Sequence, residues 1–130
     1  MLEILIGIIA GIAIIISGKM MNFEKDDSFY PLILIFISLL YILFASIDQG
    51  ISVILVESLI AALFIIFAVL GFKGNRLWVP IGYAIHGFFD ILHPYILNNS
   101  GVPEWWAGFC LGIDEVIALY LFWKIYYKKV

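Results

Sequence analysis

The stretch YPLILIFISLLYILFASIDQGISVILVESLIAALFIIFAVLGF, residues 30–72, decides the fold class. It is almost entirely apolar, except for the short polar break Asp48-Gln49-Gly50. As one helix it would be roughly 65 Å long, about twice the thickness of the hydrocarbon core of a bilayer. We therefore predict two membrane-spanning helices, joined by a tight hairpin at the polar break.

The rest of the chain has the same apolar character. Of its 130 residues, 65% are hydrophobic and only 13% are charged, whereas a soluble domain usually carries about a quarter charged residues. No basic patch suited to nucleic acid is present. The single cysteine, Cys110, excludes an intrachain disulfide and a multi-cysteine metal site. We predict one transmembrane domain over residues 1–130, with the lipid bilayer as its main partner.

The spans must be helices, because lipid cannot hydrogen-bond to exposed backbone groups. The acidic start Met1-Leu2-Glu3 lacks the basic region of a secretory signal, so the first apolar stretch counts as a span. A helix that crosses the core needs roughly 20 mostly apolar residues. The prediction is an all-α bundle of five transmembrane helices at about residues 2–18, 30–47, 51–72, 77–97 and 104–127.

Five spans place every basic residue on one side of the membrane. Basic loops face the cytoplasm, so the chain is predicted to be a multi-pass cell-membrane protein with its N-terminus outside and its C-terminus inside. The basic residues on that side are Lys19, Lys25, Lys73, Arg76, Lys124, Lys128 and Lys129.

Two pairs of glycines have the spacing that lets helices approach closely. Gly7 and Gly11 lie in the first span, and Gly108 and Gly112 lie in the last. Small residues four positions apart favour close helix contacts in membranes. Both packing within one chain and assembly of a homo-oligomer fit this pattern.

Ionisable residues inside the spans are the main functional signal, because each costs at least about 2.5–3.5 kcal/mol to place there. His86, Asp90 and His93 fall within an arc of about 60° on one helix face. Glu57 and Asp114 lie at a similar depth, roughly 9–14 Å from the outer helix ends. Histidine and carboxylate ligands suit Zn²⁺, Fe²⁺ or Mn²⁺, so we predict a divalent metal site made from these five residues.

Three functions fit this outward-facing cluster, and the pattern does not decide whether the protein is an enzyme. A metal would act as a Lewis acid on a lipid-soluble small molecule, with Glu57 or Glu115 as general base. The same residues would also serve a proton- or ion-coupled transport element. Alternatively, Asp–His pairs only tie helices together in a structural membrane subunit. Tyr41 and Tyr83 are either donors to the cluster or packing residues.

One segment and its downstream pieces resemble a known family. The family comprises small uncharacterised polytopic membrane proteins, catalogued as the domain of unknown function 6010, and the resemblance lies mainly in residues 80–123. Phe109 separates a glycine and a cysteine that are adjacent in the family, and Pro94 stands where the family has a second histidine. The resemblance implies no activity, but it implies that His86, Asp90, His93, Cys110 and Asp114 belong to one site. The matching pieces are His86-Gly87-Phe88-Phe89-Asp90-Ile91-Leu92-His93, Val102-Pro103, Gly108-Phe109-Cys110, Asp114 and Ile117-Ala118.

Overall fold

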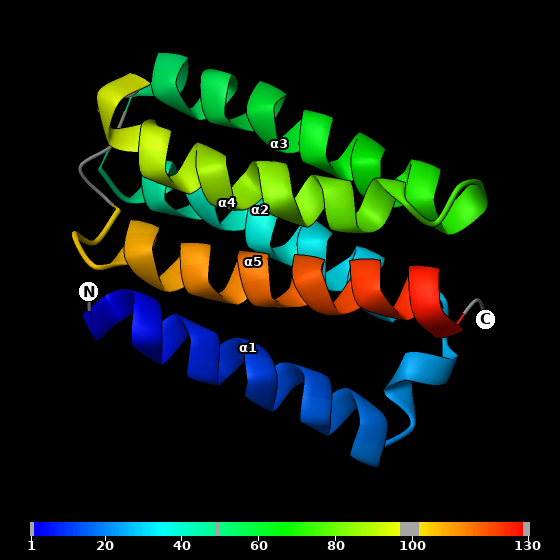
Figure 1. Cartoon of the computed structure of the whole chain (residues 1–130). Coiled ribbons are helices and arrows are strands. Elements are labelled where there is room, and N and C mark those ends of the chain that lie inside the picture. Colours follow the sequence, from blue (N-terminus) through cyan, green and yellow to red (C-terminus); the bar gives the residue numbers. More distant parts are fainter. Residues whose placement is uncertain (1, 49, 97–101, 129–130) are drawn as a thin grey trace.

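The structure is a computed structural model that describes residues 2–48, 50–96 and 102–128. These residues form five long helices and contain no strand, which confirms the predicted all-α class (Figure 1). Each helix runs antiparallel to the one before it, so the described parts of the chain begin and finish at opposite ends of the bundle. The helices are α1 (Leu2–Met20), α2 (Phe29–Asp48), α3 (Ile51–Lys73), α4 (Trp78–Ile96) and α5 (Trp106–Trp123), with short turns η1 (Phe23–Lys25) and η2 (Lys124–Lys128).

Four of the five helices are long and apolar enough to cross a membrane. They are α1, α2, α3 and the segment Trp106–Tyr127 that contains α5. Helix α4 is less apolar because it carries His86, Asp90 and His93. Those three side chains are buried, while Phe88 and Ile91 on the same helix are exposed. The fold is therefore a membrane-type bundle in which α4 turns its polar face inward.

The observed helix ends follow the predicted breaks closely, with one clear difference. Helix α2 ends at Asp48 and α3 begins at Ile51, as the polar break predicts. The last helix was predicted to begin at Glu104 but begins at Trp106. The reason is a turn in which the Trp106 N–H donates to the Pro103 carbonyl over 3.1 Å. Residue 97, the predicted end of the fourth helix, lies outside the described residues.

Helix α5 lies between α1 and α4, and α3 packs against α2 and α4 (Figure 1). The contact of α1 with α5 depends on glycine. A Cβ atom on Gly7 would collide with the Phe109 carbonyl, and one on Gly112 would lie 2.5 Å from the Ile4 carbonyl oxygen. The glycines of the first and last helices thus pack against each other within one chain, while α2 to α5 enclose the polar residues.

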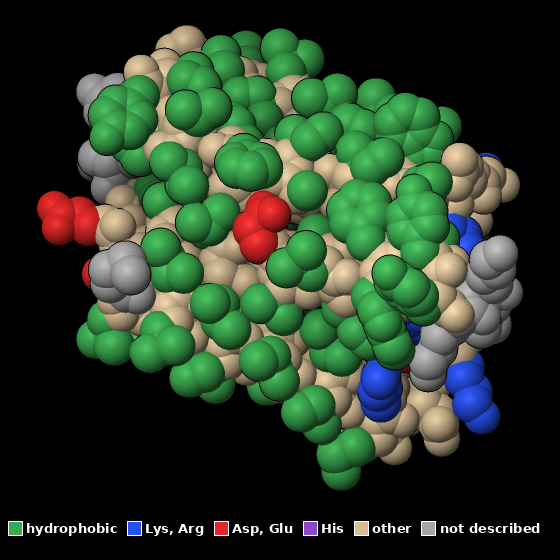
Figure 2. Space-filling view, viewed as in Figure 1, with side chains coloured by type: hydrophobic (Ala, Val, Ile, Leu, Met, Phe, Trp, Pro, Cys, Tyr) green, Lys and Arg blue, Asp and Glu red, His purple; other side chains and the backbone are tan. Residues whose placement is uncertain are grey.

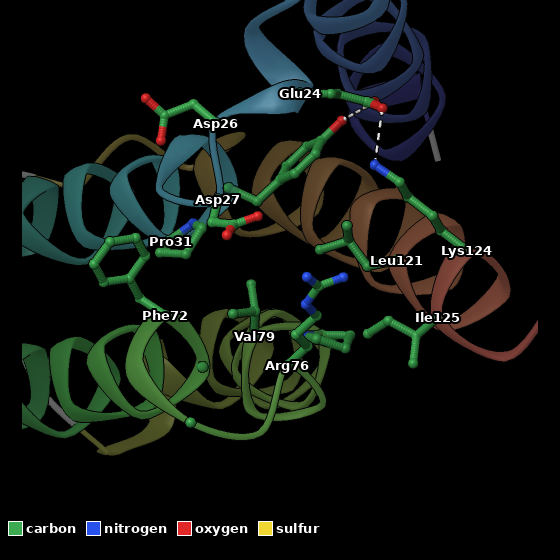
Figure 3. Close-up of a pocket in the computed structure, with 14 residues that line it drawn as sticks. Glu24, Asp26, Asp27, Pro31, Phe72, Arg76, Val79, Leu121, Lys124 and Ile125 are labelled. Atoms are coloured by element: carbon green, nitrogen blue, oxygen red, sulfur yellow. Dashed lines mark hydrogen bonds and ion pairs between the residues drawn. The ribbon is translucent and has the colours of Figure 1, made fainter. Parts of the chain in front are cut away.

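The basic side chains visible in Figure 2 gather at the end of the bundle that holds the α1–α2 and α3–α4 connections. A cavity of about 280 Å³ lies at this end. Figure 3 shows charged residues from several helix ends in its wall. Glu24 accepts hydrogen bonds from Tyr30 at 2.6 Å and Tyr120 at 2.9 Å, and it pairs with Lys124 at 3.1 Å. These bonds tie the α1–α2 connection to the end of α5.

These contacts lower the pKa of the Glu24 carboxyl group. Partial burial raises its pKa, but the hydrogen bonds from Tyr30, Tyr120 and Lys124 lower the pKa by more. The net pKa therefore lies below the ordinary value of 4.5. Glu24 is an ionised anchor at the basic end of the bundle.

Candidate intramembrane metal centre

The polar face of α4 supplies three of the five predicted ligands. His86, Asp90 and His93 recur at spacings of four and three residues, so a helix brings them to one face. Their exposed fractions are 0%, 0% and 2%. One turn beyond Asp90, Pro94 lacks an N–H, so the Asp90 carbonyl cannot receive its usual helical hydrogen bond. The face therefore carries two imidazoles, a carboxylate and a backbone oxygen with spare acceptor capacity.

His86 lies against two carboxylates. Its Nδ1 is 2.8 Å from Asp114 Oδ2 and 3.3 Å from Asp90 Oδ2. One ring nitrogen carries at most one proton, so it cannot satisfy both acceptors. Three buried atoms of this group, His86 Nε2, Asp90 Oδ2 and Asp114 Oδ1, have no hydrogen-bond partner among the described residues. The group therefore has several nitrogen and oxygen atoms that can ligate a metal ion, but too little positive charge to balance its two carboxylates.

The spacing of these atoms fits a metal ion. One ligand atom each from His86, Asp90 and Asp114 can be chosen so that all lie within 4.8 Å of one another. Metal bonds of about 2.0–2.2 Å separate two donors by at most about 4.4 Å. At a tetrahedral angle two donors lie only about 3.4 Å apart, so seating an ion would draw the most distant of these atoms together by up to about 1.4 Å. One imidazole and two carboxylates are a donor set suited to Zn²⁺, Fe²⁺ or Mn²⁺.

His93 and Glu57 form a second pair beside this group. His93 Nε2 lies 2.6 Å from Glu57 Oε2, and both side chains are buried. Tyr41 of α2 joins the two groups, because its ring stacks on His93 at 4.2 Å and its hydroxyl donates to Asp90 Oδ1 at 2.6 Å. The five predicted ligands thus gather along the inner face of α4, three in the group that contains His86 and two in the adjoining pair.

The remaining predicted residues take other positions. Tyr83 donates to the Tyr30 carbonyl over 2.6 Å and not to the cluster. Cys110 is buried and packs with Tyr41 and Trp106. Glu115 is half-buried and lies against Gly87, and it is not one of the three residues in the His86 group. Of the two candidate general bases, only Glu57 is in contact with a histidine of the site.

A cavity of about 300 Å³ reaches the site from the end of the bundle opposite the basic residues. On the other flank, the Phe64 ring meets the His86 ring edge to face at 4.6 Å. The site is therefore open toward one end and closed by an aromatic wall. The lining residues are Tyr41, Asp90, His93, Pro94, Val102, Pro103, Glu104 and Ala107.

Sequence reasoning left two roles undetermined. The sequence leaves Tyr41 and Tyr83 equivalent as candidate donors, because the partners of Tyr41 in the site are 49 positions or more away. Glu24 likewise meets Tyr120 and Lys124 only through folding, 96 and 100 positions along the chain. Only the rotation of each helix about its axis reveals these contacts.

Fold and site together define a small all-helical protein of membrane type with a buried histidine–carboxylate centre. The chain belongs to a family described as "Family of unknown function (DUF6010)", which matches residues 2–126. The match confirms the family resemblance and extends it from residues 80–123 to almost the whole chain. No curated protein and no solved structure matches the sequence.

Proposed function

We propose that the protein binds one divalent transition-metal ion inside the membrane through His86, Asp90 and Asp114. The observation that carries this proposal is the convergence of one imidazole and two carboxylates, all completely buried. One atom of each, His86 Nε2, Asp90 Oδ2 and Asp114 Oδ1, has no hydrogen-bond partner within the described part of the chain. The side chains come from α4 and α5, two helices that pack closely. Ligands are thus provided by rigid elements rather than by loops.

The energetics of the membrane favour a cation at this position. Each ionisable group inside the spans costs at least about 2.5–3.5 kcal/mol, and two neighbouring carboxylates also repel one another. A protonated His86 would balance one negative charge, whereas a divalent ion would balance both. Loss of the ion should therefore destabilise the fold as well as the site.

The surrounding residues suggest a chemical role. A metal at this position would polarise an oxygen of a lipid-soluble substrate or of a bound water molecule. Glu57 and His93, hydrogen-bonded over 2.6 Å, form a pair that can accept or release a proton beside it. Tyr41 holds the Asp90 carboxylate in place, and such supporting hydrogen bonds tune metal affinity.

We further propose that the cavity opens on the outer face of the cell membrane. The support is the gathering of basic side chains at the opposite end of the bundle, which the positive-inside rule assigns to the cytoplasm. Substrate and metal would then reach the site from outside or from the outer leaflet.

Metal titration of the purified chain tests the proposal. After chelation and dialysis, the protein is titrated with Zn²⁺, Mn²⁺ and Fe²⁺, and bound metal is counted by elemental analysis. We expect one ion per chain, lost in His86→Ala and Asp114→Asn. Ser38→Ala, a control at another buried polar residue that bonds only to the Leu34 carbonyl, should retain it. Metal-free wild-type protein, or equal metal in all variants, would overturn the assignment.

A proton-transfer role is the second candidate, and a specific arrangement favours it. From the cavity inward, the pairs Glu57–His93, Tyr41–Asp90 and His86–Asp114 follow one another. From the basic end, the Tyr30 hydroxyl donates to Glu24 and the Tyr83 hydroxyl to the Tyr30 carbonyl. Between the two series lies an apolar core that includes Leu34, Ile117 and Ala118.

Proton flux into liposomes that contain the protein tests this second role. Flux that is lost in Asp90→Asn would support a proton pathway, with the apolar core as its barrier. If neither metal binding nor flux is found, the polar pairs act as interhelical bonds, worth about 0.6 kcal/mol each in membranes. The protein would then be a structural subunit.

A further inference from the structure

Glu115 occupies a place unlike that of any other described acidic side chain. Glu57, Asp90 and Asp114 are fully buried, and the other described acids lie near helix ends. Glu115 is half-buried near the middle of α5. Figure 2 shows an acidic patch in the middle of a broad apolar face, over the place where α4 and α5 lie side by side in Figure 1. A carboxyl group at this depth faces lipid and needs a polar partner.

The carboxyl group sits in a notch that glycine creates. A Cβ atom on Gly87 would collide with Glu115 Oε2, so any larger residue there would push the carboxyl group outward. Oε2 is buried against α4 and has no hydrogen-bond partner among the described residues. The neighbouring surface is apolar, with Phe88, Ile91 and Leu119 exposed by 62%, 41% and 69%. Oε2 itself fills the notch, but the side chain as a whole is only half-buried, so the Glu115 carboxyl group is a polar group in a hydrocarbon wall.

We propose that the half-exposed Glu115 carboxyl group binds the hydroxyl group of a long-chain, lipid-soluble alcohol whose tail lies along the α4–α5 face. A hydroxyl group can donate to a carboxylate or accept from a protonated carboxyl group, so it suits Glu115 in either state. It is also neutral, and a charged amine would be far more expensive to bring to this depth. The apolar tail would contact Phe88, Ile91 and Leu119.

The notch borders the proposed metal site. Gly87 follows His86 in α4, and a Cβ atom on Gly87 would lie 3.3 Å from the Asp114 Cβ atom. Glu115 follows Asp114, and consecutive helical residues point about 100° apart, so one faces the metal site and the other faces lipid. That the bound alcohol is the substrate rests on the proposed function. The binding of the alcohol at Glu115 does not depend on the proposed function.

Photo-crosslinking tests the binding. The probe is a hexadecanol with a diazirine in mid-chain, added to protein in lipid nanodiscs, and adducts are mapped by peptide mass spectrometry. The readout is the ratio of adducts on Phe88, Ile91 and Leu119 to adducts on Leu55 and Leu59, which are exposed on α3. The matched control probe is the corresponding hexadecane with the same diazirine, which can neither donate nor accept a hydrogen bond.

We expect the ratio to fall about fivefold in Glu115→Leu and with the alkane, as the loss of one hydrogen bond predicts. Glu115→Gln, which keeps an acceptor, should retain most of the labelling. Equal labelling in Glu115→Leu, or by the alkane, would overturn the proposal. The proposal would also be overturned if the wild type is labelled weakly and forms a dimer that dissociates in Glu115→Leu. Metal content, measured in parallel, tests the proposed function separately.

Discussion

Tyr41 is the residue on which the geometry of the polar centre most depends. Its hydroxyl donates to Asp90 at 2.6 Å and its ring stacks on His93. Removing the hydroxyl in Tyr41→Phe leaves the stacking intact and frees the Asp90 carboxylate to rotate. We expect metal affinity to fall by about 10- to 100-fold, the usual cost of losing a supporting hydrogen bond, as measured by competition with a fluorescent chelator.

Tyr83→Phe is the matched control for that experiment. Tyr83 is fully buried in α4, as Tyr41 is almost fully buried in α2, and its hydroxyl donates to a backbone carbonyl outside the site. Both variants should lose some thermal stability, but only Tyr41→Phe should lose metal affinity. Equal affinities in the two variants would show that Tyr41 does not position the ligand.

The sequence alone predicts the residues that gather at the centre, but not how they pair. Helical periodicity determines that His86, Asp90 and His93 share a face. It cannot determine that His86 turns to Asp114 while His93 turns to Glu57, because these pairings depend on the rotation of α3 and α5 about their axes. The choice between Glu57 and Glu115 as the acid beside a histidine depends on the same rotations.

At the scale of elements, α1 packs against α5 through glycines, whose lack of a side chain lets the two backbones approach closely. Gly7→Ala would place a methyl group against the Phe109 carbonyl. We expect a loss of about 1–3 kcal/mol from this overpacking, read as a lower thermal midpoint in detergent. Metal binding should persist, because α1 contributes no residue to the site.

Gly50→Ala provides the comparison for Gly7→Ala. A Cβ atom on Gly50 would meet nothing within 4 Å, and its backbone has φ −75°. This variant should unfold at the wild-type temperature. If Gly7→Ala is equally harmless, the contact between α1 and α5 is looser than the structure shows.

The α1–α2 connection is held to α5 by Glu24, and this contact depends on pH. Because the Glu24 pKa is lowered in the folded protein, the ionised form stabilises the fold above pH 4.5, and this contribution is lost as the pH falls through the lowered pKa. The difference in thermal midpoint between wild type and Glu24→Gln should therefore shrink between pH 6 and pH 3, within about three units of pH.

The Glu24 prediction has its control at the opposite end of the bundle. Glu104 is an exposed acid there, and Glu104→Gln should follow the wild-type pH profile. A constant difference between wild type and Glu24→Gln at every pH would mean that the carboxylate charge does not anchor the connection.

The helices themselves were predictable because the bilayer fixes their length and polar breaks fix their ends. The break at residues 48–50 is an example, since no other division of that stretch fits the membrane. The predicted start of the last helix, residue 104, lies two residues before the observed start of α5, because the Pro103 carbonyl accepts from the Trp106 N–H in a preceding turn. Local turns of this kind leave little trace in composition.

For the whole molecule, the five-helix arrangement predicts that the two loop ends lie on opposite sides of the membrane. Cys110 is the only cysteine, so Cys110→Ala gives a background for single-cysteine labelling. Glu104→Cys should react with a membrane-impermeant maleimide in intact cells, and Lys25→Cys only after permeabilisation. The reverse pattern would invert the predicted orientation, and labelling of both in intact cells would contradict the spanning arrangement.

The order in which the helices pack could not be predicted from the sequence. Hydropathy identifies spans but not neighbours, so the position of α5 between α1 and α4 is visible only in the structure. The glycine pairs illustrate the point, because the same spacing serves contacts within a chain and contacts between chains. The structure shows the former, and a homo-oligomer stays a prediction.

X-ray absorption at the edge of the bound metal tests the central claim most directly, because it counts the ligands of the ion. With His86, Asp90 and Asp114 as ligands, the spectrum should show one imidazole, oxygen donors and no sulfur, and the imidazole signal should vanish in His86→Ala and persist in His93→Ala. An imidazole signal unchanged in His86→Ala, a sulfur ligand from Cys110, or no specifically bound metal would contradict the account.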